Sequence, residues 1–279
     1  MTDRRSPSTG WFAGIDPGDP EAAAGAIRDG SGDAVREWPQ VAVESGAFDS
    51  EADYYAALHD ATVTATRAAV REAETADDRQ LIHSVRAMDD CERVANELAE
   101  RVAEWAGSRR EDAGTGVDYA GTLAGEDDAA EPLVSLARRV CDLDDEAASL
   151  RAHVQRTAPE VAPNLSALAG PVLAARLVAL AGGLKDLARK PSGTIQVLGA
   201  EEALFAHLRG HAPSPKHGVI FVHEAIQGTS PEHRGSAARA LAGKLAIAAR
   251  IDHYTGDRKP ELDAELEERI ERIRERETE

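Results

Sequence analysis

The chain has 279 residues, of which 50 are acidic and 32 basic, and its formal net charge is −18. Only 4% of the residues are aromatic and much of the 42% hydrophobic fraction is alanine, which favours thin helical packing over one large globular core. The two cysteines, Cys91 and Cys141, fit neither a disulfide framework nor a metal-binding spacing, so we interpret them as reduced, half-buried residues.

The basic residues are 27 arginines and only 5 lysines. Together with the acid excess, this favours a protein adapted to a salt-rich cytoplasm, where molar salt shortens the Debye length to about 3 Å and screens self-repulsion. The alternative is an acidic protein from an organism that lives at ordinary salt.

The sequence predicts neither a signal peptide nor a membrane span. Residues 1–10 are polar and no apolar run follows them. The most apolar window, residues 167–184, contains Pro171, Arg176 and Gly182, so we expect a buried helix pair there. These features predict a cytoplasmic location.

Residues 1–76 are expected to form a short region of mixed α and β structure. Glycine and proline separate small apolar groups, which predict two or three short strands or turns at Trp11, Phe12, Ile15, Ile27, Val35, Trp38, Val41 and Val43. From Glu51 to Glu74 the spacing of apolar residues predicts a helix.

Residues 77–157 carry two apolar seams at coiled-coil spacing. The first seam is Leu81, Val85, Met88, Ala95, Leu98, Val102 and Trp105. The second seam is Leu133, Leu136, Val140, Leu143, Ala147, Leu150 and Val154. Two such helices predict an antiparallel coiled-coil hairpin. The acidic, glycine-containing connection over residues 107–131 is expected to be mobile.

The sequence assembles no catalytic or metal site. His207 and His211 have the spacing of a helical zinc pair, but no third ligand follows at a suitable distance. His223 and Glu224 begin like a zinc-protease motif, yet residue 227 is Gln. We therefore expect no enzyme activity, no metal and no cofactor, and a hydrolase that uses these histidines is a distant alternative.

Residues 158–256 differ from the rest of the chain in charge. This stretch contains ten Lys and Arg residues and seven acids, so its net charge is +3 and that of the remainder is −21. A locally basic stretch on a strongly acidic protein favours an anionic partner.

Several features of this stretch suit RNA. Residues 199–201 are expected to open a helix whose free N–H groups would suit phosphate. The loop over residues 213–218 presents Lys216 and His217, a pair suited to phosphate and to stacking on a base. Arg239 and Arg250 are eleven residues apart and share one helix face, with Lys244 near it. The alternatives are that these arginines are solvated surface charges and that His217 lies in the core.

The same stretch resembles a known family in its ordered motifs. These are Pro163-Asn164-Leu165-Ser166-Ala167-Leu168, Thr194-Ile195-Gln196-Val197-Leu198-Gly199-Ala200-Glu201, Ala203-Leu204-Phe205, Pro215-Lys216-His217-Gly218, Arg234-Gly235 and Ala249-Arg250-Ile251-Asp252. Over residues 158–256 the chain resembles the Nop domain of the archaeal Nop5 and eukaryotic Nop56/Nop58 family. Residues 81–107 resemble the first coiled-coil helix of that family.

The resemblance implies a mainly α fold with a short, reduced α/β fibrillarin-docking region (1–76), an antiparallel coiled-coil hairpin (77–157) and a compact helical Nop domain (158–256). The alternation of acids with arginines predicts a fourth part, a charged tail helix (257–279) that is solvated or frayed, where relatives commonly carry a basic tail. It implies a non-catalytic scaffold of a box C/D guide ribonucleoprotein that directs 2′-O-methylation of rRNA or tRNA. Its partners would be kink-turn guide RNA, an L7Ae-type protein, a fibrillarin-like methyltransferase and a second copy bound through the coiled coil.

The candidate RNA-binding residues on this basis are Gln196, Gly199, Ala200, Glu201, Lys216, His217, Arg234, Arg239, Lys244 and Arg250. Three positions depart from the family pattern, because Glu202, Ala206 and Ser236 stand where Lys, Arg and Lys are usual. Each change removes a phosphate contact or adds repulsion. The alternative function is therefore a protein–protein adaptor that keeps the fold and has lost RNA contact.

Overall fold

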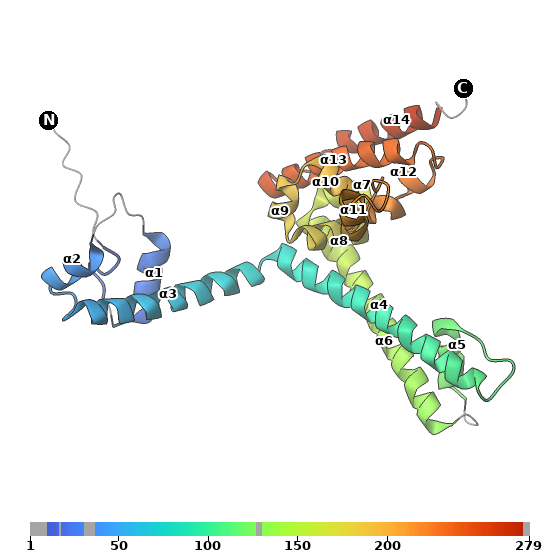
Figure 1. The fold of residues 1–279 in the computed structure, drawn as a ribbon, viewed down its shortest axis with the longest axis horizontal. Coiled ribbons are helices and arrows are strands. Elements are labelled where there is room, and N and C mark those ends of the chain that lie inside the picture. Colours follow the sequence, from blue (N-terminus) through green and yellow to red (C-terminus); the bar gives the residue numbers. More distant parts are fainter. Residues whose placement is uncertain (1–9, 17, 31–36, 127–129, 276–279) are drawn as a thin grey trace. The chain divides into compact units, whose positions relative to one another are not determined.

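The computed structural model describes residues 10–16, 18–30, 37–126 and 130–275, and it is mainly helical (Figure 1). The chain divides into two compact units, Met1–Ala76 and Asp77–Glu279. The second unit holds both the hairpin and the compact helical domain.

The first unit contains helices α1 (Pro20–Asp29), α2 (Trp38–Glu44) and α3 (Glu51–Glu74). The expected helix over residues 51–74 is confirmed, and the Ser50 hydroxyl caps it by accepting from the Asp53 amide. The expected strands are wrong at Ile27, Trp38, Val41 and Val43, which are helical, while Val35 lies outside the described residues.

Aromatic packing explains why the apolar groups of the first unit need no sheet. Phe12 is 5% exposed and lies within about 6 Å, centroid to centroid, of the rings of Trp11, Phe48 and Tyr54. Edge-to-face arrangements of this kind stabilise a small core made from turns and short helices.

The hairpin consists of α4 (Asp77–Gly107) and α6 (Glu131–Val161), which lie side by side (Figure 1). They run antiparallel, because the start of α4 shares a core with the end of α6 and the end of α4 shares another with the start of α6. Alanines form much of the buried seam, so Ala99 and Ala106 are buried where the spacing predicted Leu98 and Trp105.

The connection between these helices is more ordered than the sequence predicted. Helix α5 (Gly116–Ala124) lies within it and packs against both α4 and α6. Ala120 and Leu123 have no exposed surface, so the segment adds its own apolar contacts to the end of the hairpin. An ion pair between Arg110 and Glu126 closes the described part of this segment.

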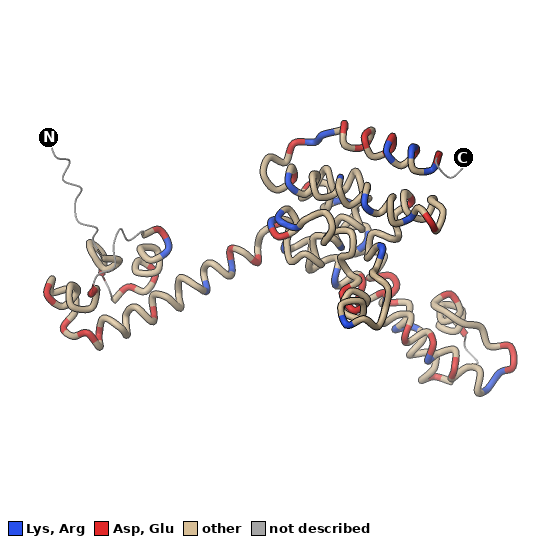
Figure 2. The backbone as a smooth tube through the Cα atoms, turned by 45° about the horizontal axis from the view of Figure 1, so that its top comes forward, with Lys and Arg blue, Asp and Glu red and all other residues tan. Residues whose placement is uncertain are grey.

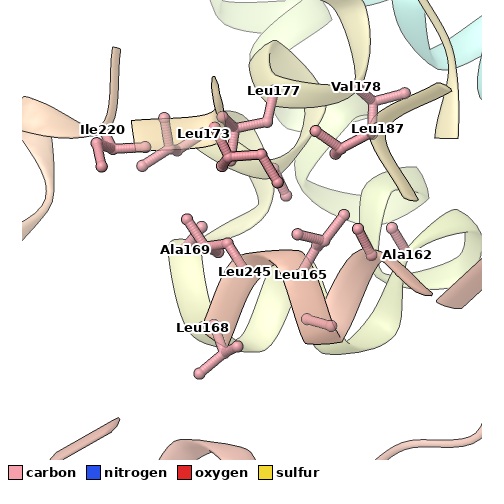
Figure 3. Packing of buried hydrophobic residues seen from close by; sticks show 14 of the residues in the cluster. Ala162, Leu165, Leu168, Ala169, Leu173, Leu177, Val178, Leu187, Ile220 and Leu245 are labelled. Atoms are coloured by element: carbon pink, nitrogen blue, oxygen red, sulfur yellow. The ribbon is translucent and has the colours of Figure 1, made fainter. Parts of the chain in front are cut away.

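The compact domain is built around α13 (Arg234–Tyr254). In Figure 3, Leu245 of α13 faces Leu165 and the labelled side chains of neighbouring helices. The elements around it are α7 (Pro163–Ala169), α8 (Pro171–Ala181), α9 (Leu184–Arg189), α10 (Ser192–Val197), α11 (Glu201–Leu208), the 3-10 helix η1 (Val219–Val222) and α12 (Glu224–Gln227).

A buried carboxylate joins the two ends of this domain. Asp252 is 7% exposed, and its Oδ1 accepts from the backbone N–H and the side-chain amide of Asn164 at 2.9 and 2.6 Å. Its Oδ2 accepts from the Leu165 amide at 2.9 Å. The last residue of α13 that is buried therefore caps the first turn of α7, which has no side-chain cap of its own.

The sequence predicted a solvated tail helix, but one side of this helix is buried. Helix α14 (Glu261–Glu275) lies beside α13 (Figure 1) and buries one apolar stripe, Leu262, Leu266, Ile270 and Ile273. The alternating acids and arginines lie on the opposite face of the helix. Because they surround the four apolar residues in the sequence, the apolar stripe was not recognised from the sequence.

Ion pairs attach the compact domain to the hairpin. Arg176 of α8 donates to both carboxylate oxygens of Asp89 on α4, with the shortest bond at 2.5 Å. Glu92, one turn further along α4, lies 3.8 Å from Arg176 and also pairs with Arg151 of α6 within the hairpin. The pKa of Arg176 is raised by its hydrogen bond to Asp89, so the guanidinium is firmly charged.

None of the described helices alone combines the length and hydropathy that a membrane crossing requires; α7 and α8 meet those criteria only as a pair bent by 118°.

Candidate nucleic-acid interface

Two loops of the compact domain are joined by backbone hydrogen bonds. The Gly218 amide donates to the Gln196 carbonyl at 2.8 Å, and the Val219 amide donates to the Leu198 carbonyl at 2.7 Å. The Gln196 side chain also donates to the Lys216 carbonyl at 2.7 Å. Three of the predicted RNA-binding residues, Gln196, Lys216 and His217, are thereby brought together.

Glycine is required where these loops meet. Gly199 has a φ of +81°, and a Cβ there would lie 3.3 Å from the Val219 side chain. A residue with a side chain would have an unfavourable backbone conformation here and would crowd Val219. Gly199 therefore allows the two loops to lie close together.

His217 is half-buried and stacked on an aromatic ring. Its imidazole lies 4.3 Å from the Phe221 ring, centroid to centroid, with 19° between the planes. The Arg234 guanidinium lies over the same Phe221 ring, 5.6 Å from its centroid. His217 is therefore neither a core residue nor a fully free one, because Phe221 covers one face of the imidazole and a base would use the other face or the edge.

The surroundings of His217 disfavour its charged form. Burial lowers the pKa of His217 most, and the positive charges of Arg234 and Lys216 lower the pKa further, against an opposing backbone hydrogen bond. A neutral imidazole beside two cations suits stacking on a base, while Lys216, which is exposed, and Arg234 suit phosphate.

The start of α11, where the sequence predicted an anion site, carries negative charges of its own. The helix begins at Glu201, as the sequence predicted. However, the Gly199 amide donates to the Glu201 carboxylate at 2.9 Å, and Glu202 adds a second negative charge to the first turn. The segment Gly199-Ala200-Glu201 thus has its own anion at the place where phosphate was expected.

The cations of α13 that follow Arg234 fall into two places. Arg239 and Lys244 line a groove of about 470 Å³ between α13 and α14, where Lys244 pairs with Glu265. In Figure 2 the Lys and Arg positions of α14 alternate with Asp and Glu along the helix. Arg250 instead donates to the Ala188 carbonyl at the end of α9, at 3.2 Å.

The predicted grouping of Arg239 with Arg250 is therefore incomplete. Eleven residues extend about 16 Å along a helix, so two residues at the same angle meet different neighbours. Arg239 has α14 beside it and Arg250 has α9, which the periodicity of one helix cannot reveal.

Two of the three histidines considered for metal or hydrolysis, His207 and His223, contact backbone atoms through their rings. His207 Nδ1 lies 3.0 Å from the Ala212 carbonyl. His223 Nδ1 accepts from the Ala225 amide at 3.1 Å, so its Nε2 carries the proton and donates to the Leu168 carbonyl at 2.8 Å. Both rings hold turns in place.

Sequence reasoning missed Phe221 and Thr229. Phe221 is one of only four phenylalanines and stands four residues after His217, a spacing that could have indicated the stack. Thr229 is 2% exposed and its carbonyl accepts from Arg234 Nε at 3.2 Å, which no local pattern announces.

The chain is similar to several known proteins. Residues 74–275 match the Nop family model, described as "snoRNA binding domain, fibrillarin". An uncharacterized NOP5 family protein of Methanocaldococcus jannaschii is 35% identical over 276 residues, which cover 84% of this chain and 66% of that protein. Human nucleolar protein 56 is 41% identical over 123 residues, covering 44% of this chain and 21% of its own.

A solved structure is also similar. A chain of the crystal structure of a fibrillarin/Nop5p complex matches with a TM-score of 0.56 and 25% sequence identity, over 91% of each chain. The present chain spans just under two thirds of its archaeal relative and about a fifth of the human one. Since the family model covers most of the sequence, the chain belongs to the Nop family of snoRNA-binding-domain proteins.

Proposed function

We propose that this chain is a non-catalytic, RNA-binding scaffold of a box C/D guide ribonucleoprotein. In this role it bridges kink-turn guide RNA, with an L7Ae-type protein bound, to a fibrillarin-like methyltransferase that carries out 2′-O-methylation. The observation that supports RNA contact most directly is the cluster of Lys216, His217 and Arg234 around Phe221, in which phosphate-binding and base-stacking groups lie together.

Partner proteins would occupy other parts of the chain. Fibrillarin is named in the description of the matching family and is a component of the similar solved complex, and we assign its docking to the first unit. The hairpin would join two copies of the scaffold. A net charge of −18 opposes unaided capture of RNA at low salt, so the L7Ae-type protein would contribute to the binding surface.

The binding test uses a kink-turn RNA preloaded with an L7Ae-type protein. We expect His217→Ala to weaken binding by about 1–3 kcal/mol with little change in the salt slope, because a stacked plane is lost. Lys216→Ala should instead lower the salt slope by about one unit. Arg156→Ala removes an exposed charge from α6 and serves as the control.

A protein–protein adaptor without RNA contact is the second candidate. The Glu201 carboxylate on the Gly199 amide favours it, because this contact occupies a backbone donor that phosphate would need. Wild-type protein that binds the L7Ae-type protein equally with and without RNA, and carries no RNA from cell extract, would establish the adaptor and reject the scaffold's RNA role.

A further inference from the structure

The last turn of α14 contacts α12 and the segment that follows it. Arg274 Nη2 donates to the Glu224 carbonyl at 3.2 Å, and Arg274 Nε donates to the Thr229 hydroxyl at 3.4 Å. Helix α14 itself is held on the domain by its buried leucines and isoleucines. Arg274 lies on the exposed side and contributes these two contacts rather than core packing.

Thr229 connects Arg274 to the candidate RNA-binding cluster. The Thr229 hydroxyl donates to the Ala225 carbonyl at 2.9 Å, so its oxygen is free to accept from Arg274. The Thr229 carbonyl accepts from Arg234 Nε, which orients the guanidinium over Phe221. Because Thr229 is 2% exposed, water cannot readily replace these partners.

Gly228 shows that space is kept for the Arg274 side chain. A Cβ at Gly228 would lie 2.8 Å from Arg274 Nη2 and 2.9 Å from the Glu224 carbonyl oxygen. A side chain at this position would therefore collide with the guanidinium and with the backbone carbonyl it binds. The turn is shaped so that Arg274 can reach across it.

We propose that Arg274 is a positioning residue for the RNA-binding cluster, an inference that rests on the proposed function. By holding Thr229, Arg274 fixes the carbonyl that orients Arg234, and Arg234 in turn keeps Phe221 stacked under His217. The tail helix thus sets the geometry of a site that it does not itself form.

The test uses the full chain with kink-turn RNA and an L7Ae-type protein. Arg274→Ala should weaken binding by about fivefold, a size expected for residues that act through a packed network. Arg272→Ala is the matched control, since it removes the same charge from the same helix, and Arg272 bonds to Glu268 and lines the groove between α13 and α14 rather than contacting Thr229. Arg272→Ala should bind like wild type once salt is matched.

A double-mutant comparison separates positioning from general destabilisation. In an Arg234→Ala background, Arg274→Ala should have little further effect, because the group whose orientation depends on Arg274 is gone. Equal affinities for Arg274→Ala and Arg272→Ala, or full additivity with Arg234→Ala, would overturn the proposal.

A measurement without RNA keeps this inference distinct from the proposed function. The ring-proton resonances of His217 depend on its stack with Phe221, so Arg274→Ala should shift them and Arg272→Ala should not. Unchanged His217 resonances in Arg274→Ala reject the positioning role even if RNA binds. Wild-type protein that binds no RNA while the resonances do shift rejects only the RNA function.

Discussion

At the scale of single residues, His217 contributes to packing and belongs to the cluster that we propose binds RNA. Its imidazole covers Phe221 and so belongs partly to the fold, while the adjacent Lys216 stays exposed. The neutral form is favoured by burial and by two neighbouring cations. Protonation would therefore disturb the same contact that presents the ring to RNA.

This predicts a pH dependence of stability. The pKa of His217 in the folded protein is below 6.5, the value expected for the unfolded chain, so the unfolded state binds more protons in the interval between the two. The stability contribution is fully present above pH 6.5 and is lost as the pH falls through that interval. Thermal melting of wild type and His217→Phe from pH 8 to pH 5 measures it.

The His217→Phe variant keeps an aromatic ring against Phe221 and cannot titrate. We expect its melting temperature to fall less steeply with acid than that of wild type, although both lose carboxylate interactions. Parallel curves for the two proteins would mean that His217 does not contribute to the pH dependence.

At the scale of elements, the sequence predicts helices with strong periodicity and misses those whose partners are distant. The hairpin helices and α13 follow from regular apolar spacing. The sequence predicts a solvated α14, since its four buried residues are spread through acids and arginines, and the stripe packs only against elements that precede it in the chain, α13 and α7. It misses helix α5 for a similar reason, because Ala120 and Leu123 gain burial only from the closed hairpin.

The same distinction applies to the candidate site. The loop residues Lys216 and His217 are identifiable from proline and glycine positions and from the family resemblance. Their neighbours Phe221 and Thr229 are not, since the stack and the carbonyl contact depend on how η1, α12 and α13 meet. Likewise, Arg239 and Arg250 lie at nearly the same angle around α13, which the sequence predicts. Their neighbours differ, because α14 lies beside Arg239 and α9 lies beside Arg250, and this does not follow from the sequence.

The packing of α14 can be measured directly. Leu266 is 6% exposed, so Leu266→Ala should lower the free energy of unfolding by about 2–4 kcal/mol through lost burial and a cavity. The exposed neighbour Glu267 provides a control, and Glu267→Ala should change it by less than about 0.5 kcal/mol. Equal effects in denaturant titration would show that the tail helix does not contribute to the core.

At the scale of the whole molecule, the hairpin leaves apolar side chains along its length. Leu136, Leu143 and Leu150 belong to the predicted seam, yet each is only half-buried because alanines form the contact between α4 and α6. A row of half-exposed leucines is the kind of surface that a second hairpin covers.

We therefore expect the protein to form a dimer of about twice 29.7 kDa in molar KCl, where charge repulsion is screened. Light scattering at micromolar concentration measures the mass, and Leu143→Glu should shift it towards the monomer. Glu146→Ala, on an exposed position of the same helix, should leave it unchanged. A wild-type mass of one chain would contradict self-association through the hairpin.

The Asp252 carboxylate also determines which part of the chain can complete its structure first during synthesis. The residues it caps at the start of α7 precede it by 88 and 87 positions, so that turn has no side-chain cap until the far end of α13 has been synthesised. The hairpin needs no such delay, because α4, α5 and α6 are consecutive and pack on one another. During translation the arm that would join protomers is therefore complete before the domain that would hold RNA, and a chain cut short before Asp252 keeps the first and lacks the second.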